Sequence, residues 1–172
     1  MSAEHAILLK DGDALEIKDL STKAGNGVYL KVDNALEIGV GTRFICGEQL
    51  FRLDPPVSAT ESDEADTTFF SSPRTVSAFS VTQLLEGGAE GLVVSSKDGR
   101  LRFGREHGDV NFPQDVYLSA NHAIIEQKSS ETFVLKDLNS RNGVYVRLDR
   151  KTALRKGDTL FIGKQLLRVE FS

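Results

Sequence analysis

The chain contains two copies of one sequence unit. Residues 26–53 align without a gap on residues 142–169, and both segments begin with Asn-Gly-Val-Tyr. Both also carry Gln-Leu-x-Arg directly before their last residue and share two further glycines at matching positions. Shorter blocks upstream match as well, 18–20 with 136–138 and 2–7 with 119–124. Because a repeated unit folds in the same way each time, a fold predicted for one copy constrains the other.

The second copy is longer than the first at its N-terminal end. About forty residues, from Phe79 on, precede Ser119, whereas only Met1 precedes the matching Ser2. Met1 aligns with the apolar Leu118. We therefore expect that the chain starts at an internal methionine of a longer protein; the alternative is a half-domain that a partner completes.

A polar segment separates the copies. Residues 54–77 are rich in Pro, Ser, Thr and acids and have little apolar periodicity, as in a linker. The sequence thus predicts a truncated, degenerate copy over residues 1–53, an acidic linker over 54–77 and a complete domain over 78–172. The linker acids are Asp54, Glu61, Asp63, Glu64 and Asp66.

Both copies have the pattern of β-structure. Apolar residues alternate with polar ones at Leu15 and Ile17, at Leu101 and Phe103, and over residues 167–171. Turn signals such as Asn-Gly and Lys-Gly-Asp recur at short intervals, and the sequence offers no long amphipathic helix. Many short strands at this spacing predict an all-β sandwich or barrel.

Charge and composition exclude several classes of protein. Without the five linker acids, 20 acidic residues stand against 21 basic ones, so the folded parts are nearly neutral. This balance argues against a nucleic-acid binder, because such proteins normally carry a basic stripe. One cysteine allows neither an internal disulfide nor a zinc pattern, and no metal or cofactor is expected. No signal peptide or long apolar run is evident, which predicts a cytoplasmic protein without membrane contact.

Three motifs follow one another in the second copy, each between strand-like segments. They are Gly104-Arg105, Ser119-x-x-His122 and residues 137–143 (DLNSRNG). In this order the motifs resemble the forkhead-associated (FHA) family, whose members bind phosphothreonine peptides, and the resemblance covers residues 79–171. It implies an FHA-type β-sandwich of two twisted antiparallel sheets with about 11 strands in the complete copy.

The resemblance also implies which residues bind a phosphopeptide. Arg105 matches the arginine that contacts the peptide, and a guanidinium at a rigid strand end suits phosphate. Ser119 matches the serine that donates to the phosphate, and Asn142 the asparagine that bonds the peptide backbone. Asn121, Asn139, Ser140 and Arg141 complete the expected binding set, with Gly104, His122 and Gly143 as structural residues.

One position departs from the family pattern. Family members often carry Arg, Lys or Asn directly after the serine, and this chain has Ala120. The main hypothesis is a phosphothreonine-binding module that acts as an adaptor or regulatory domain in signalling. The alternative is a protein-interaction scaffold that kept the FHA fold and lost the pocket. The first copy retains Ser2, His5 and Asn26 without a Gly-Arg partner, so we expect no complete site there.

Catalysis is not expected, because the sequence offers neither a phosphate-cradling glycine loop nor a nucleophile beside a base. The expected partner is a phosphothreonine-containing protein, which implies a Ser/Thr kinase. Thr60, Thr67 and Thr68 lie in the acidic linker and make the chain itself a possible ligand.

Overall fold

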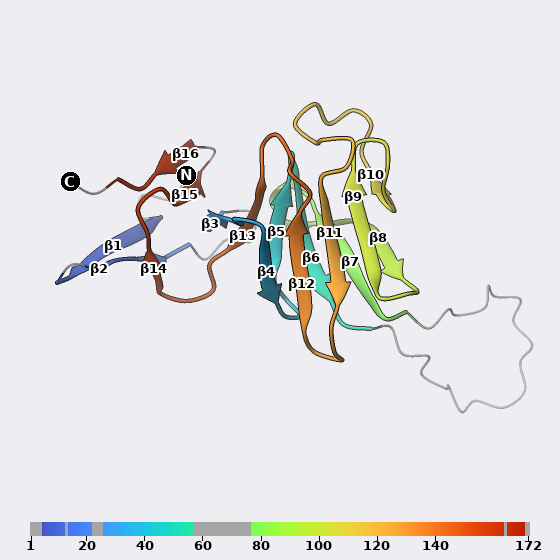
Figure 1. The fold of residues 1–172 in the computed structure, drawn as a ribbon, viewed down its shortest axis with the longest axis horizontal. Helices are drawn as coiled ribbons and strands as arrows, with labels where there is room; N and C mark the ends of the chain where they lie inside the picture. Colours follow the sequence, from blue (N-terminus) through green and yellow to red (C-terminus); the bar gives the residue numbers. More distant parts are fainter. Residues whose placement is uncertain (1–4, 13, 22–25, 57–76, 164, 171–172) are drawn as a thin grey trace, which may run out of the picture.

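The computed structural model describes residues 5–12, 14–21, 26–56, 77–163 and 165–170 as a β-protein (Figure 1). The predicted all-β class is confirmed, and the helical structure in these residues is a short 3-10 turn, Glu86–Gly88. The strands are β1 (Ala6–Asp11), β2 (Ala14–Asp19), β3 (Val28–Lys31), β4 (Ala35–Ile38), β5 (Arg43–Cys46), β6 (Gln49–Asp54), β7 (Phe79–Leu84), β8 (Glu90–Ser96), β9 (Arg100–Gly104), β10 (Val110–Asn111), β11 (Ala123–Gln127), β12 (Phe133–Asp137), β13 (Val144–Arg147), β14 (Thr152–Leu154), β15 (Thr159–Ile162) and β16 (Gln165–Arg168).

The strands form three sheets. A five-stranded sheet has the order β10-β9-β11-β12-β4, and a three-stranded sheet has the order β1-β2-β14. An eight-stranded sheet, β16-β15-β3-β13-β5-β6-β7-β8, runs through the whole molecule. The pairs are antiparallel, apart from the short parallel pair of β9 and β10.

Strands of the two sequence copies pair with each other. β4 of the first copy pairs with β12 of the second, and β13 of the second pairs with both β3 and β5 of the first. In return, β14 pairs with β2 and β15 with β3. The repeat alignment places β4–β6 on β14–β16. Each copy therefore contributes these three strands to the half of the molecule that the other copy begins.

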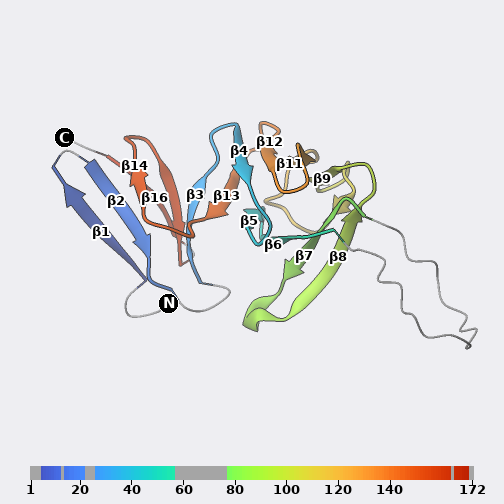
Figure 2. The same ribbon diagram turned by 90° about the horizontal axis from the view of Figure 1, so that it is seen from below.

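Two halves result, which Figure 2 shows at opposite ends of the molecule. The covered sandwich consists of β4–β13, and the open half consists of β1–β3 with β14–β16. The predicted division at residues 53 and 77 describes the sequence repeat and stays a prediction. Strand pairing runs across this division, which the repeat pattern alone did not indicate.

The core of the covered sandwich is aromatic. Phe44, Phe51 and Phe103 are at most 2% exposed, and their ring centroids lie 5.1–5.4 Å from one another. Phe79 packs edge-on against Phe133 at 5.2 Å. These residues alternate with more exposed ones along their strands, which places one face of each sheet inside. The five-stranded and eight-stranded sheets thus enclose one packed core. The candidate site lies in loops that connect strands of this sandwich.

Candidate functional site

Gly104 brings the first predicted motif against the second. A Cβ atom at Gly104 would lie 2.1 Å from the backbone oxygen of Ala120, so the strand end and the loop meet only if residue 104 is glycine. Directly after it, the amide of Arg105 donates to the backbone oxygen of Ser119 over 2.9 Å. The end of β9 therefore fixes Arg105 beside Ser119.

His122 connects the second motif to the third. Its Nδ1 accepts a hydrogen bond from the amide of Ser119 at 3.0 Å, so its Nε2 carries the proton that is donated to the oxygen of Gly143, also at 3.0 Å. Burial lowers the pKa of His122 and outweighs the opposing effect of the Gly143 hydrogen bond and the Asp137 and Asp115 carboxylates. A neutral, fully buried imidazole thus holds two loops together.

The loop between β12 and β13 has a fixed shape. Asp137 accepts a hydrogen bond from the amide of Ser140 at 3.1 Å, and the Ser140 hydroxyl accepts one from the amide of Gly143 at 2.9 Å. Asn139 and Gly143 have positive φ angles of 57° and 85°, which asparagine and glycine tolerate best. Asn139 and Ser140 therefore lie in the loop that shapes the site. The Ser140 hydroxyl oxygen accepts its hydrogen bond from Gly143 within that loop.

Two further hydrogen bonds join this loop to the Ser119 loop. The amide of Arg141 donates to the Ser119 hydroxyl at 3.1 Å, and the Asn142 side chain donates to the backbone oxygen of Tyr117 at 2.8 Å. The structure thus links Arg105, Ser119, Arg141 and Asn142 through direct contacts. Asn121 is exposed beside them, next to the buried His122.

The Arg105 side chain is available to a ligand. It is 38% exposed and its Nε lies 3.2 Å from the carboxylate of Glu106, which is 53% exposed. An exposed pair of this kind contributes little stability, about 0–1 kcal/mol. The other nearby acid, Asp109, accepts a hydrogen bond from the amide of Arg102 instead. A dianionic ligand would therefore compete with a weak ion pair at Arg105.

Asp115 supports the same loops and was not predicted from the sequence. This buried carboxylate accepts hydrogen bonds from the amides of Tyr117 and Glu48, at 3.0 and 2.8 Å, and from the Gln49 side chain at 3.0 Å. A Cβ atom at Gly47 would lie 2.6 Å from it. The bond to Tyr117 is an Asx turn that the sequence could have indicated. The contact with the first copy follows only from strand pairing.

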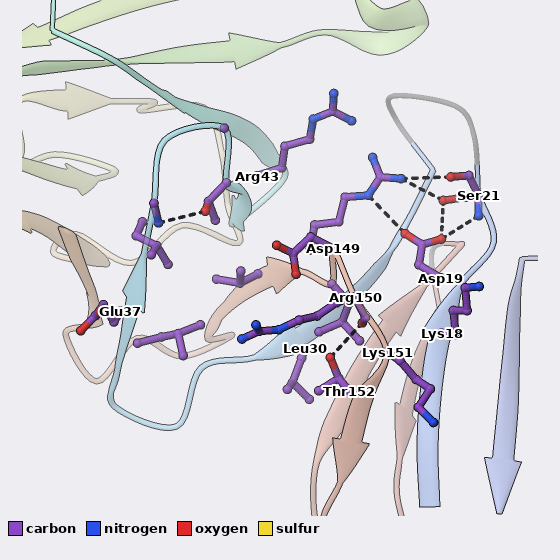
Figure 3. Close-up of a pocket in the computed structure, with 18 of the residues that line it drawn as sticks. Lys18, Asp19, Ser21, Leu30, Glu37, Arg43, Asp149, Arg150, Lys151 and Thr152 are labelled. Atoms are coloured by element: carbon purple, nitrogen blue, oxygen red, sulfur yellow. Dashed lines mark hydrogen bonds and ion pairs between the residues drawn. The ribbon is translucent and has the colours of Figure 1, made fainter. Parts of the chain in front are cut away.

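A cavity of about 970 Å³ lies elsewhere, at the junction of the two halves (Figure 3). There Arg147 of β13 donates to Asp19 of β2 at 3.2 Å and to the hydroxyl of Ser21 at 3.1 Å. None of the predicted phosphopeptide residues lines this cavity. We place the candidate site on the exposed loops, because the three motifs meet there.

Residues 101–163 match the family model of the FHA domain. The chain contains an FHA domain. The matched segment holds all three motifs of the second copy, so the predicted family is confirmed there. The presence of a second FHA-like copy over residues 1–53 stays a prediction.

One solved structure similar to this chain is that of Mycobacterium tuberculosis EmbR in complex with a low affinity phosphopeptide. It is 24% identical, and the match covers 52% of this chain and 27% of that chain with a TM-score of 0.30. This chain therefore matches about a quarter of the length of that structure. No curated protein matches the chain.

Neither a metal cluster nor a membrane-spanning helix occurs in the described residues of the chain. His, Cys, Asp and Glu do not gather there in any group of three that could hold a metal ion. The same residues form no helix that is both long and apolar enough to span a membrane.

Proposed function

We propose that the FHA domain binds phosphothreonine-containing proteins through Arg105, Ser119 and Asn142, as an adaptor or regulatory module in signalling. One observation carries the proposal. Three motifs that are distant in the sequence meet on one exposed surface, and hydrogen bonds through the buried His122 hold them there. A site that is positioned before its ligand arrives loses little conformational entropy on binding.

The chemistry of each group suits a phosphopeptide. A phosphothreonine is a dianion at neutral pH with three strong acceptor oxygens. The Arg105 guanidinium offers charge and paired donors. The Ser119 hydroxyl accepts a bond from the amide of Arg141, so its own hydrogen remains to donate to phosphate. The Asn142 side chain donates one N–H to the backbone oxygen of Tyr117. Its own side-chain oxygen remains able to accept a hydrogen bond from a peptide amide.

Ala120 favours the alternative function, a phosphate-independent scaffold. It lies between Ser119 and Asn121, and its side chain can neither donate a hydrogen bond nor carry charge. A phosphate in this site would therefore have fewer cationic partners than in family members with Arg or Lys there. We expect weaker phosphate binding for this reason, and no loss of the fold.

Mutation of Arg105 tests the proposal. In a titration with phosphothreonine peptides selected from a library, Arg105→Ala should cost about 1.5–3 kcal/mol of binding free energy. That cost corresponds to roughly 10- to 150-fold in affinity. Ser119→Ala and Asn142→Ala should weaken binding as well. Arg102→Ala is the matched control, because Arg102 is an exposed arginine on β9, the strand that ends just before Arg105, and lies outside the site. No phosphopeptide binding at about 100 μM, or equal binding of unphosphorylated peptides, would contradict the proposal and favour the scaffold function.

The linker threonines are proposed as a ligand in the same chain. Thr60, Thr67 and Thr68 lie outside the described residues, so their support is the acidic, kinase-accessible sequence around them. Tethering would give the linker a roughly millimolar effective concentration, which is enough to occupy even a low-affinity site. Phosphorylation of the linker by a Ser/Thr kinase should then lower the affinity for an added phosphopeptide. Unchanged affinity after complete phosphorylation would leave the linker as a tether.

A further inference from the structure

We propose that either of two three-strand units of this chain can close the covered sandwich, and that Phe44 and Phe51 favour one of them. The first closing unit is β4–β6, and the second closing unit is β14–β16. The structure holds the first closing unit in the covered sandwich. The proposal concerns a rearrangement within one chain and does not depend on phosphate binding.

The two closing units have the same internal structure. β5 pairs with β6, and β15 pairs with β16, as antiparallel hairpins at matching residues of the repeat. In the first unit the amide of Gly41 donates to the oxygen of Leu53 over 2.7 Å. In the second unit the amide of Gly157 donates to the oxygen of Val169 over 2.8 Å. The φ angles of the two glycines are 87° and 94°. Each unit could therefore take the place of the other without a change in its turns.

Both units also pair with their neighbours in the same register. β4 places Glu37 opposite Val134 of β12, and β14 places Ala153 opposite Glu16 of β2. Along the aligned copies, Glu37 corresponds to Ala153 and Val134 to Glu16. β5 on β13 and β15 on β3 match in the same way. An exchange of the two units would thus keep the register of the strands on which they lie.

The chain crosses between the halves at two symmetric points. After β3, the amide of Val32 donates to the oxygen of Val144 over 2.8 Å. After β13, the amide of Leu148 donates to the oxygen of Val28, also over 2.8 Å. β3 and β13 pair with each other between these points (Figure 1). This is the arrangement of a domain swap, formed between two copies in one chain. If both crossing segments turned back, each closing unit would return to its own copy.

The loop that contains Asp115 can be held by either unit. Asp115 accepts hydrogen bonds from the amide of Glu48 and the side chain of Gln49 in the first unit. The second unit has Gln165 at the position of Gln49 and a non-proline residue at that of Glu48, so it carries the same two donors. The support of the loop between Asp115 and Ser119 therefore does not restrict the covered sandwich to the first unit.

Core side chains distinguish the two units. Phe44 and Phe51 are at most 2% exposed, and their ring centroids lie 5.4 and 5.1 Å from that of Phe103. The second unit has Leu160 and Leu167 at these two positions. Leucine keeps the core apolar, but it buries less surface than a phenyl ring and makes no ring contacts. The covered core thus favours the first unit, and the second arrangement is the minor state.

Disulfide trapping in the full chain distinguishes the arrangements. Cys46 is the single cysteine, and Cys46→Val removes it. In that background, Val134→Cys with Glu37→Cys reports the first unit, and Val134→Cys with Ala153→Cys reports the second. Opposite residues of antiparallel strands have Cα atoms about 4.5–5.5 Å apart, a separation that a disulfide can bridge. Val134→Cys with Leu92→Cys is the control, because β12 and β8 belong to different sheets.

A variant that moves the aromatic residues should change the outcome. Phe44→Leu and Phe51→Leu, combined with Leu160→Phe and Leu167→Phe, keep the composition of the chain and should favour the second arrangement. In a glutathione redox buffer the disulfide that reports the second unit should form in a minor fraction of chains with the parent core. It should increase roughly tenfold in the four-residue variant, while the disulfide that reports the first unit decreases. Non-reducing gels of the monomer fraction measure both disulfides.

Two outcomes would overturn the proposal. The first is that the disulfide reporting the second unit stays at the level of the Leu92 control. This must hold both in the four-residue variant and in the parent core refolded from urea under oxidising conditions. Because the refolding experiment needs no core substitution, it decides the matter even if the variant does not fold. The second outcome is that this disulfide forms only between chains in a dimer fraction, since the exchange would then join two molecules.

Discussion

The covered sandwich and the open half begin from closely similar strands and differ in what lies over them. His122 bonds the oxygen of Gly143 at 3.0 Å, and the corresponding His5 lies 3.3 Å from the oxygen of Gly27. The local turn geometry is thus repeated. The apolar faces are not equally buried, because the covered sandwich has β7–β10 and the open half has no corresponding strands among the described residues.

This difference bears on function. The candidate phosphopeptide loops lie on the covered sandwich, where His122 and Asp115 are both buried and hydrogen-bonded. A rigid support is what a preorganised binding site requires. The open half has a small core of its own and an exposed groove. The candidate site therefore lies on the half whose core is covered by both sheets.

The largest expected effect comes from truncating matched core positions. Phe51→Ala should lower the free energy of unfolding by about 3–5 kcal/mol, because it leaves a cavity among Phe44, Phe103 and Phe112. Leu167→Ala at the corresponding position should cost less than about 1 kcal/mol, because Leu167 is already half exposed. Urea denaturation measures both. Equal losses would mean that the groove is covered in solution.

The next effect concerns the junction of the halves. Arg147→Ala should lower the free energy of unfolding by about 1.5–3 kcal/mol, because Arg147 and Asp19 are largely buried and hydrogen-bonded. Arg168→Ala is the matched control. It breaks an exposed pair with Glu170 and should stay within about 1 kcal/mol. A small loss for Arg147→Ala would show that strand pairing alone joins the halves.

The Asp19 carboxylate also makes the junction sensitive to acid. Burial acts to raise its pKa, but hydrogen bonds from Ser21 and Val28, together with Arg147, outweigh burial and lower the pKa below its ordinary value. The stabilisation is therefore present above about pH 4 and lost as the pH falls through the folded-state pKa. In Asp19→Asn this part of the acid response should disappear.

A smaller effect tests the contact between the first copy and the loop that contains Asp115 and Ser119. Gly47→Ala places a Cβ against Asp115 in addition to a φ of 61° that costs about 1–2 kcal/mol for other residues. Gly41→Ala, at φ 87° with no atom within 4 Å, carries only the backbone cost. We expect Gly47→Ala to be the less stable variant and to bind phosphopeptide more weakly. Equal stability and affinity would show that Asp115 adapts without moving the loop.

The smallest effect is a pH response of the covered sandwich. The lowered pKa of His122 means that the unfolded chain binds more protons than the folded one between the two pKa values. Stability should therefore fall as the pH drops below about 6.5 and level off below the folded-state pKa. Urea midpoints between pH 7.5 and 5 would show it. His107→Asn, at an exposed histidine, should keep the response, and His122→Asn should reduce it.

Much of the local structure followed from residue patterns. Alternation at Leu101 and Phe103 and at Leu15 and Ile17 indicated strands, because side chains on a strand point to opposite faces in turn. Gly104, His122 and Gly143 were expected as structural residues from the resemblance of the three motifs to the FHA family. Asp115 was missed, because one of its partners is the amide of Glu48, 67 residues earlier in the sequence.

The sequence by itself determined which segments form strands, which side chains face inward and which family residues 101–163 match. Strand formation and the alternation of inward and outward side chains depend on residues close together in the chain. Only the tertiary structure decided that β4–β6 close the covered sandwich and that β14–β16 join the open half. The two sets of strands have the same alternation and the same turns, so no local pattern distinguishes them. The choice depends on contacts between residues far apart in the chain, and these exist only once the sheets have formed.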